Sequence, residues 1–114
     1  MSVVDDTEHR LRVLQLLNDN ARRYFVGIRV VITASIAADH DLQANLLCKV
    51  RLYDDFSAKT DPDRDHSAGE IEHAGETFLW RIAYYDPTME YGSEDPADPH
   101  KTVRVLTLMR PCED

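Results

Sequence analysis

The stretch GEIEHAGETFLWRIAYYD, residues 69–86, decides the fold. Two runs that alternate between apolar and polar side chains flank Ala74-Gly75, and a glycine at such a point is typical of a tight turn between antiparallel strands. In the second run, Phe78, Trp80 and Ile82 fall on one face, because side chains alternate across a strand. The stretch therefore predicts a β-hairpin with one buried face.

Two further segments are predicted to add strands to this hairpin. GIRVVITA, residues 27–34, is rich in β-branched side chains, which favour strands. TVRVLTLMR, residues 102–110, has apolar side chains on both faces. Because such a strand is buried on both sides, we expect residues 102–110 to lie at the centre of the sheet.

Two helices are predicted before the hairpin. In residues 6–23 apolar side chains recur at intervals of three and four, with Asp5 or Asp6 as the N-cap. Asp39 is placed to cap a second helix, which ends near Asp54. The helical spacing indicates that each helix has one apolar stripe with which it packs on the sheet.

The order helix, strand, helix, strand, strand, strand predicts one α+β domain over residues 1–114. We expect a four-stranded, mainly antiparallel sheet with both helices packed on one face. No apolar run approaches the ~20 residues that span a bilayer, and the N-terminal MSVVDDTEHR is acidic where a secretory signal is basic and then apolar. These features predict a cytoplasmic protein that has no contact with membranes.

Several functional classes lack their motifs in this sequence. No glycine-rich phosphate loop, Walker motif or dinucleotide fingerprint occurs. Cys48 and Cys112 have no CxxC or Cys/His spacing around them, so we expect neither a zinc site nor a disulfide framework. Cys48 is interpreted as a small core residue.

The formal net charge of -8 is concentrated in the middle of the chain. Residues 54–100 contain 13 acidic side chains and three basic ones. Such a segment repels nucleic acid and anionic membranes, and it attracts cations or basic protein surfaces. We therefore expect a protein partner with a basic surface, no direct nucleic-acid binding and no cofactor.

Two long predicted loops, residues 55–68 and 87–101, carry many of these acids. Prolines restrict the backbone of the second loop, which lowers the entropy lost when the loop is held in one conformation. If both loops lie at the same end of the sheet, their carboxylates form one rigid outward array that can bind a basic site. The candidate partner-binding residues are Asp61, Asp63, Asp65, Glu90, Glu94, Asp95 and Asp98.

The first loop also has an alternative interpretation as a metal site. Asp61, Asp63 and Asp65, with Glu72 eleven residues after the first, match acidic positions of an EF-hand calcium loop. The match is incomplete, because His66 stands where the sharp turn needs glycine and a strand follows instead of a helix. These four carboxylates are the candidate metal ligands, and His66 is a candidate for acid–base chemistry without a nucleophile motif beside it.

The second loop contains a further pattern. Tyr91-Gly92-Ser93 is followed by Asp95-Pro96-Ala97-Asp98-Pro99, then by Thr102 and Arg104-Val105-Leu106-Thr107. This pattern resembles the signature of a family of short bacterial proteins of unknown function, which are often found on plasmids and other mobile elements. The resemblance extends through Phe78-x-Trp80-x-Ile82-x-Tyr84-Tyr85-Asp86, Asp54-Asp55-Phe56, Asp61-Pro62, His66 and Gly27-x-Arg29-Val30-Val31-x-Thr33.

The resemblance covers residues 25–109 and implies no established activity, cofactor or catalytic residue. The chain departs from the family pattern at Arg64 and Ser67, where members tend to have Gly and Asp. Charge and resemblance together predict a small acidic interaction protein that is not an enzyme. Its concrete form is an inhibitor of a bacterial defence complex, of anti-CRISPR or antirestriction type, that acts partly as a nucleic-acid mimic. The alternative is a small metal-dependent enzyme or cation-binding protein that uses the Asp61–His66 loop.

Overall fold

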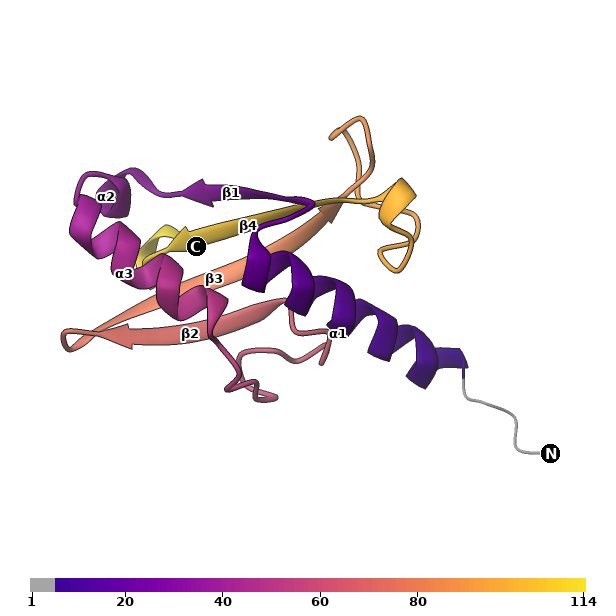
Figure 1. Cartoon of the computed structure of the whole chain (residues 1–114), viewed down its shortest axis with the longest axis horizontal. Coiled ribbons are helices and arrows are strands. Elements are labelled where there is room, and N and C mark those ends of the chain that lie inside the picture. Colours follow the sequence, from indigo (N-terminus) through magenta and orange to yellow (C-terminus); the bar gives the residue numbers. More distant parts are fainter. Residues whose placement is uncertain (1–5) are drawn as a thin grey trace.

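A computed structural model describes residues 6–114 as a four-stranded sheet with helices on one face (Figure 1). The main elements are α1 (Asp6–Tyr24), β1 (Ile28–Ile32), α2 (Ala34–Ala37), α3 (His40–Arg51), β2 (Ala68–His73), β3 (Glu76–Tyr85) and β4 (Val103–Met109). Short 3-10 helices cover Pro99–Lys101 and Pro111–Glu113. The α+β fold is confirmed, while the suggestion that Asp5 caps α1 falls outside the described residues.

β4 is an internal strand of the sheet, in which the strand order is β1-β4-β3-β2. β4 pairs antiparallel with β3 and parallel with β1, and β2 pairs antiparallel with β3. The sheet is therefore mixed but mostly antiparallel. Its two internal strands, β3 and β4, include the strand that the sequence places at the centre because of its two apolar faces.

The β2–β3 hairpin turns at the predicted position. Ala74 and Gly75 have φ angles of 52° and 79°, as a two-residue hairpin turn with two positive φ angles requires. Opposite Trp80 the register places Gly69. A Cβ atom on Gly69 would overlap Trp80 Nε1 and lie 2.7 Å from Tyr53 Cε1, so only glycine allows this close approach.

The hydrophobic core lies between the sheet and the helices. Helix residues Ile36, Leu46 and Val50 contribute to it. The sheet contributes Ile71, Phe78, Trp80, Ile82, Leu106 and Leu108. Cys48 is exposed, which corrects its interpretation as a core residue: the buried stripe of α3 runs through Leu46 and Val50.

The structure has three helices where the sequence analysis placed two. The additional helix, α2, is only four residues long, yet its Ile36 is completely buried. A segment this short contains little more than one helical turn, so it has no repeating apolar period to recognise. Among residues 6–114, no helix combines the length and apolar character needed to cross a membrane.

Candidate functional site

A buried polar network attaches α1 to the sheet and to the first long loop. Asn18 of α1 is completely buried. Its Nδ2 donates to Asp65 O at 2.9 Å and to Tyr84 Oη at 2.6 Å, and its Oδ1 accepts from Arg104 Nε at 2.7 Å. Because buried polar groups require hydrogen-bond partners, these contacts hold α1, the loop, β3 and β4 in one arrangement.

Asp61 is 2% exposed, which contradicts its predicted place in an outward array. Its carboxylate accepts hydrogen bonds from the backbone N–H groups of His66 at 3.0 Å and Ser67 at 3.3 Å. The backbone turns sharply here, since Arg64 and His66 both have φ of 61°. Asp61 therefore faces inward to satisfy the N–H groups of a tight turn.

Asp65 is 6% exposed and is also turned inward, so its predicted outward position is wrong. Its carboxylate accepts from Tyr84 Oη at 2.6 Å and from Ser67 Oγ at 2.5 Å. Burial raises the pKa of Asp61, the N–H groups that it binds act to lower that pKa, and the nearby Asp65 raises it further. Burial and the hydrogen bond to Asp65 also raise the pKa of Tyr84.

His66 is held in a defined orientation beside a hollow. Its Nδ1 lies 3.0 Å from Asp19 Oδ1 and 3.1 Å from Oδ2, and its ring stacks on Phe56 with centroids 3.9 Å apart. With a proton on Nδ1 donated to the carboxylate, Nε2 is left as an acceptor. His66 lines a hollow of about 330 Å³ together with Ser57 and Arg64. This arrangement is compatible with acid–base chemistry.

Arg22 is a structural residue that the sequence analysis missed. It is completely buried and its Nη1 donates to Val50 O at 3.1 Å and Tyr53 O at 2.8 Å. These carbonyls lie at the C-terminal end of α3, where a helix has unpaired acceptors and a partial negative charge. The sequence contained one sign of this role, because Asn18 and Arg22 are polar residues four positions apart in α1, on the side of the helix that is buried.

Residues of the second long loop mostly hold that loop in place. Asp95 pairs with Arg10 of α1 at 2.8 Å. Asp98 caps the 3-10 helix Pro99–Lys101 by accepting from His100 N at 2.9 Å. The carboxylates of Asp95 and Asp98 therefore already have partners within the protein. Of the predicted partner-binding residues, Asp63, Glu90 and Glu94 are exposed.

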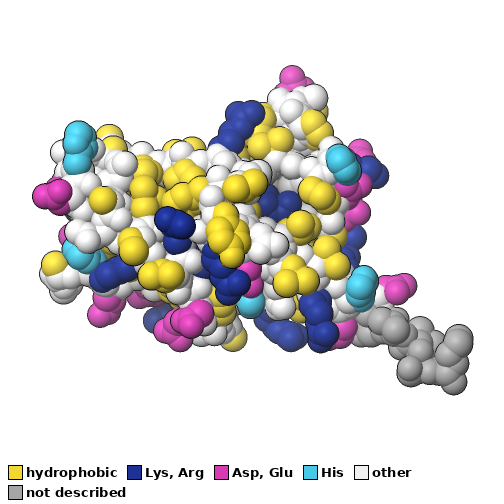
Figure 2. Space-filling model, viewed as in Figure 1, with side chains coloured by type: hydrophobic (Ala, Val, Ile, Leu, Met, Phe, Trp, Pro, Cys, Tyr) yellow, Lys and Arg dark blue, Asp and Glu magenta, His cyan; other side chains and the backbone are white. Residues whose placement is uncertain are grey.

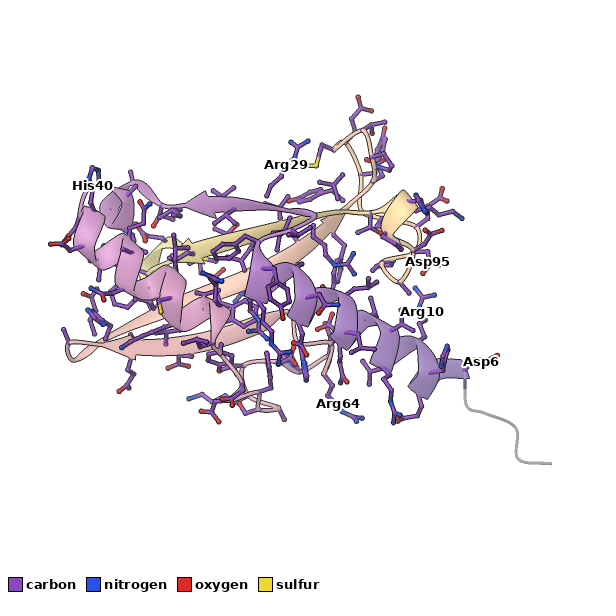
Figure 3. The ribbon with its side chains drawn as sticks, viewed as in Figure 1. Asp6, Arg10, Arg29, His40, Arg64 and Asp95 are labelled. Atoms are coloured by element: carbon purple, nitrogen blue, oxygen red, sulfur yellow. The ribbon has the colours of Figure 1, made fainter. Side chains whose placement is uncertain are left out.

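The two long loops flank α1 instead of converging. In Figure 3, Arg64 of the first loop lies on one side of α1, whereas Asp95 lies on the other side and faces Arg10. The prediction of a single outward array is therefore wrong, because α1 passes between its two halves. The physical cause is the Asn18 network, which places α1 across the end of the sheet.

The proposed metal ligands also do not assemble. Across residues 6–114, no three His, Cys, Asp or Glu side chains gather where a metal ion could bind. Asp61 and Asp65 point into the protein, whereas Asp63 and Glu72 are exposed. The resemblance to an EF-hand loop therefore does not extend to its coordination geometry.

Glu72 instead lies with Asp55 and Glu70 in a groove along β2. The hollow has a volume of about 460 Å³ and is lined by Tyr53, Asp55, Ser57, Lys59, Thr60, Glu70 and Glu72; we call it the β2 acidic groove. Tyr53 Oη donates to Asp55 O at 2.9 Å and accepts from Glu70 N at 3.3 Å, which joins the loop to the strand. In Figure 2, acidic side chains lie along the lower edge of the molecule, the side on which Figure 1 labels β2.

Comparison with known families adds to this geometry. The family described as protein of unknown function DUF3768 matches residues 32–113. The chain belongs to the DUF3768 family. The DUF3768 match begins at the last residue of β1 and includes the hairpin, both long loops and β4, whereas α1 precedes it. The predicted relation to a family of unknown function is confirmed, and the chain matches no curated protein and no solved structure.

Proposed function

We propose that this DUF3768 protein is an interaction protein without enzymatic activity, and that it binds a basic surface of a protein partner through the β2 acidic groove. The observation that carries the proposal is that Asp55, Glu70 and Glu72 line one groove in which Lys59 is the only cation. In the part of the chain that the structure describes, none of these three carboxylates has an ion-pair partner. Their charge is therefore available to a partner.

The electrostatics of the whole chain favour the same kind of partner. A net charge of -8 attracts a basic surface from a distance and accelerates association, and salt weakens this effect. The same charge repels a phosphate backbone, so the proposed partner is a protein and not a nucleic acid. An arginine-rich surface fits best, because arginine forms bidentate hydrogen bonds with carboxylates.

In its more specific form, the proposal is that the partner belongs to a bacterial defence complex in the cytoplasm. The basic site would then be a nucleic-acid-binding surface, and this chain would be an inhibitor of anti-CRISPR or antirestriction type. Charge supports this version, because three carboxylates line the β2 acidic groove.

The test is affinity capture from the native host with matched variants. The groove variant carries Asp55→Asn, Glu70→Gln and Glu72→Gln, and the control carries Asp41→Asn, Glu90→Gln and Glu94→Gln. Both variants lose the same charge, and the control positions are exposed. We expect wild type and control to capture the same basic protein and the groove variant to lose it. Capture by the groove variant at the wild-type level would refute the proposal.

A second candidate function is acid–base catalysis at His66. The specific observation in its favour is the Asp19–His66 contact of 3.0 Å beside the hollow of about 330 Å³. A hydrolase assay against ester and phosphoester substrates, with Asp19→Asn and His66→Gln as variants, tests it. Turnover by wild type that both variants abolish, with unchanged circular dichroism, would favour this candidate over the interaction protein.

The metal-dependent version of the enzyme needs its own test. Calorimetric titration with calcium, magnesium, manganese and zinc measures whether the Asp61–His66 loop binds an ion. Because Asp61 and Asp65 face inward, we expect no saturable heat at millimolar ion. Stoichiometric binding that Asp63→Ala removes would restore the metal-dependent alternative.

A further inference from the structure

We propose that the ends of α1 and α3 form a second binding surface, which takes an acidic and partly apolar segment of a protein partner. Three large apolar side chains mark it: Tyr24, Val26 and Leu52 are 66%, 71% and 76% exposed. Scattered surface apolar residues need no explanation, but a group of them indicates an interaction site. We call this region the Tyr24 surface.

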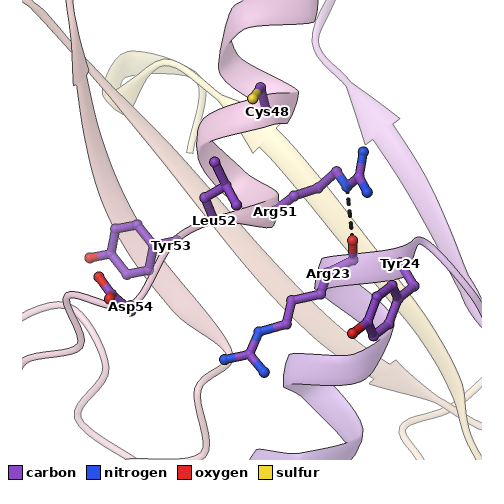
Figure 4. Close-up of a pocket in the computed structure, with 7 residues that line it drawn as sticks. All are labelled: Arg23, Tyr24, Cys48, Arg51, Leu52, Tyr53 and Asp54. Atoms are coloured by element: carbon purple, nitrogen blue, oxygen red, sulfur yellow. Dashed lines mark hydrogen bonds between the residues drawn. The ribbon is translucent and has the colours of Figure 1, made fainter.

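The Tyr24 surface consists of two adjoining hollows. One has a volume of about 420 Å³ and is lined by Arg23, Tyr24, Arg51 and Leu52, among others (Figure 4). The other has a volume of about 460 Å³ and is lined by Leu17, Tyr24, Val26 and Pro99, among others. Because Tyr24 lines both hollows, they form one continuous surface with an aromatic side chain at its centre.

The charge of the Tyr24 surface is opposite to that of the chain. Arg23 is exposed, and its guanidinium has no hydrogen bond or ion pair with residues 6–114. Arg51 donates from Nε to Arg23 O at 2.8 Å and lies 5.7 Å from the centre of the Phe25 ring, so its Nη groups remain available. Asp54 is the one carboxylate among the residues that line the hollow of about 420 Å³.

Some arginines elsewhere in the described residues are already paired. Arg10, Arg22, Arg81 and Arg110 each pair with a carboxylate. Basic residues in the last turn of a helix also complement the helix dipole, which accounts for a positive charge at these two helix ends. The dipole does not account for the exposed tyrosine, valine and leucine beside the charge.

These features together specify the chemistry of the occupant. Carboxylates of a partner segment can bind Arg23 and Arg51 through charge-assisted hydrogen bonds, and apolar side chains can cover Tyr24 and Leu52. Tyrosine and arginine are also among the residues most enriched at the positions that contribute most to binding energy in protein interfaces. A nucleic acid would also supply anions, but it has no aliphatic side chains to cover Val26 and Leu52, which are 71% and 76% exposed. The occupant is therefore a protein segment.

Fluorescence anisotropy with a defined probe tests this surface. The probe is a labelled peptide of three Asp-Leu-Glu-Phe repeats, and its control has Asn and Gln in place of Asp and Glu. We expect saturable binding of the acidic peptide only. Arg23→Gln should weaken it at least about tenfold, the effect of losing one charge-assisted hydrogen-bonded pair, and Leu52→Ser should also weaken it. Arg12→Gln, an exposed charge change on the same helix, should leave it unchanged.

Three results would overturn the inference. The first is absence of saturable binding at millimolar peptide, and the second is equal binding of the neutral peptide. The third is displacement of the peptide by oligothymidine, which would make the site one for nucleic acid. Since the β2 acidic groove binds a partner of opposite charge, its three-residue variant should bind the peptide like wild type. The peptide assay therefore tests the Tyr24 surface alone, and the capture experiment tests the β2 acidic groove, so either proposal can fail without the other.

Discussion

Replacing Asn18 with alanine should strongly destabilise the protein, because this side chain is completely buried and fully hydrogen-bonded. The substitution removes three hydrogen bonds, to Asp65 O, Tyr84 Oη and Arg104 Nε. Neutral bonds contribute about 1 kcal/mol each and a bond to a charged group contributes about 2 kcal/mol, so their loss costs about 4 kcal/mol. Alanine has a higher helix propensity than asparagine, and this difference offsets about 0.7 kcal/mol of the lost stability.

The expected net loss is therefore about 3 kcal/mol, a large fraction of the roughly 5–15 kcal/mol by which a domain is stable. Urea unfolding followed by circular dichroism measures it, and thermal unfolding should show a midpoint about 10 °C lower. Asn20→Ala is the matched control, because Asn20 is exposed on the same helix and only the propensity changes. A loss below about 1 kcal/mol for Asn18→Ala, or equal values for both variants, would refute the reasoning.

Two further predictions concern packing and pH. Gly69→Ala should cost about 1–3 kcal/mol in urea unfolding, because the new methyl group meets Trp80 and Tyr53, whereas Gly92→Ala has room and should be nearly neutral; equal effects would contradict the packing argument. The pKa of the Asp61 carboxyl is raised in the folded state. The protonated carboxyl therefore stabilises the fold fully at a pH below the pKa of this group in the unfolded chain, and the stabilisation is lost as the pH rises through its pKa in the folded protein. Wild type should therefore gain stability relative to Asp61→Asn between about pH 7 and about pH 4, and a difference that is independent of pH would count against a raised pKa.

Much of the fold follows from local patterns in the sequence. Alternation around Ala74-Gly75 predicts the hairpin, and the two apolar faces of residues 102–110 predict the central strand. Helix α2 could not be predicted in this way, because it is stabilised by the burial of Ile36 and not by a repeating pattern. Short elements of this kind depend on tertiary contacts.

The direction of the acidic side chains could not be predicted from composition. Asp65 points inward because it accepts from Tyr84, which is 19 residues away in the chain. The separation of the two loops likewise depends on α1, whose position is set by Asn18 and Arg104 across 86 residues. Asn18 and Arg22 interrupt the buried side of α1, and this interruption was the one local sign of a buried polar network.

The acidic character of the proposed binding surface could be predicted from the sequence, but the position of that surface could not. The net charge of -8 indicates an acidic protein, yet the groove is lined by Asp55, Glu70 and Glu72, of which only Glu72 was a candidate residue, and that as a metal ligand. β2 and the first loop come together there through Tyr53 Oη, which contacts both. Such a groove becomes visible only when strand and loop are placed side by side.

The most direct test of the account is the affinity of the captured partner for wild type and for the groove variant, measured as salt is raised. If the β2 acidic groove binds a basic surface, wild-type affinity falls steeply with salt, and the groove variant binds at least about tenfold more weakly at low salt with a flatter dependence. Equal affinities of the two proteins, or a wild-type affinity unaffected by a several-fold rise in salt, would contradict it.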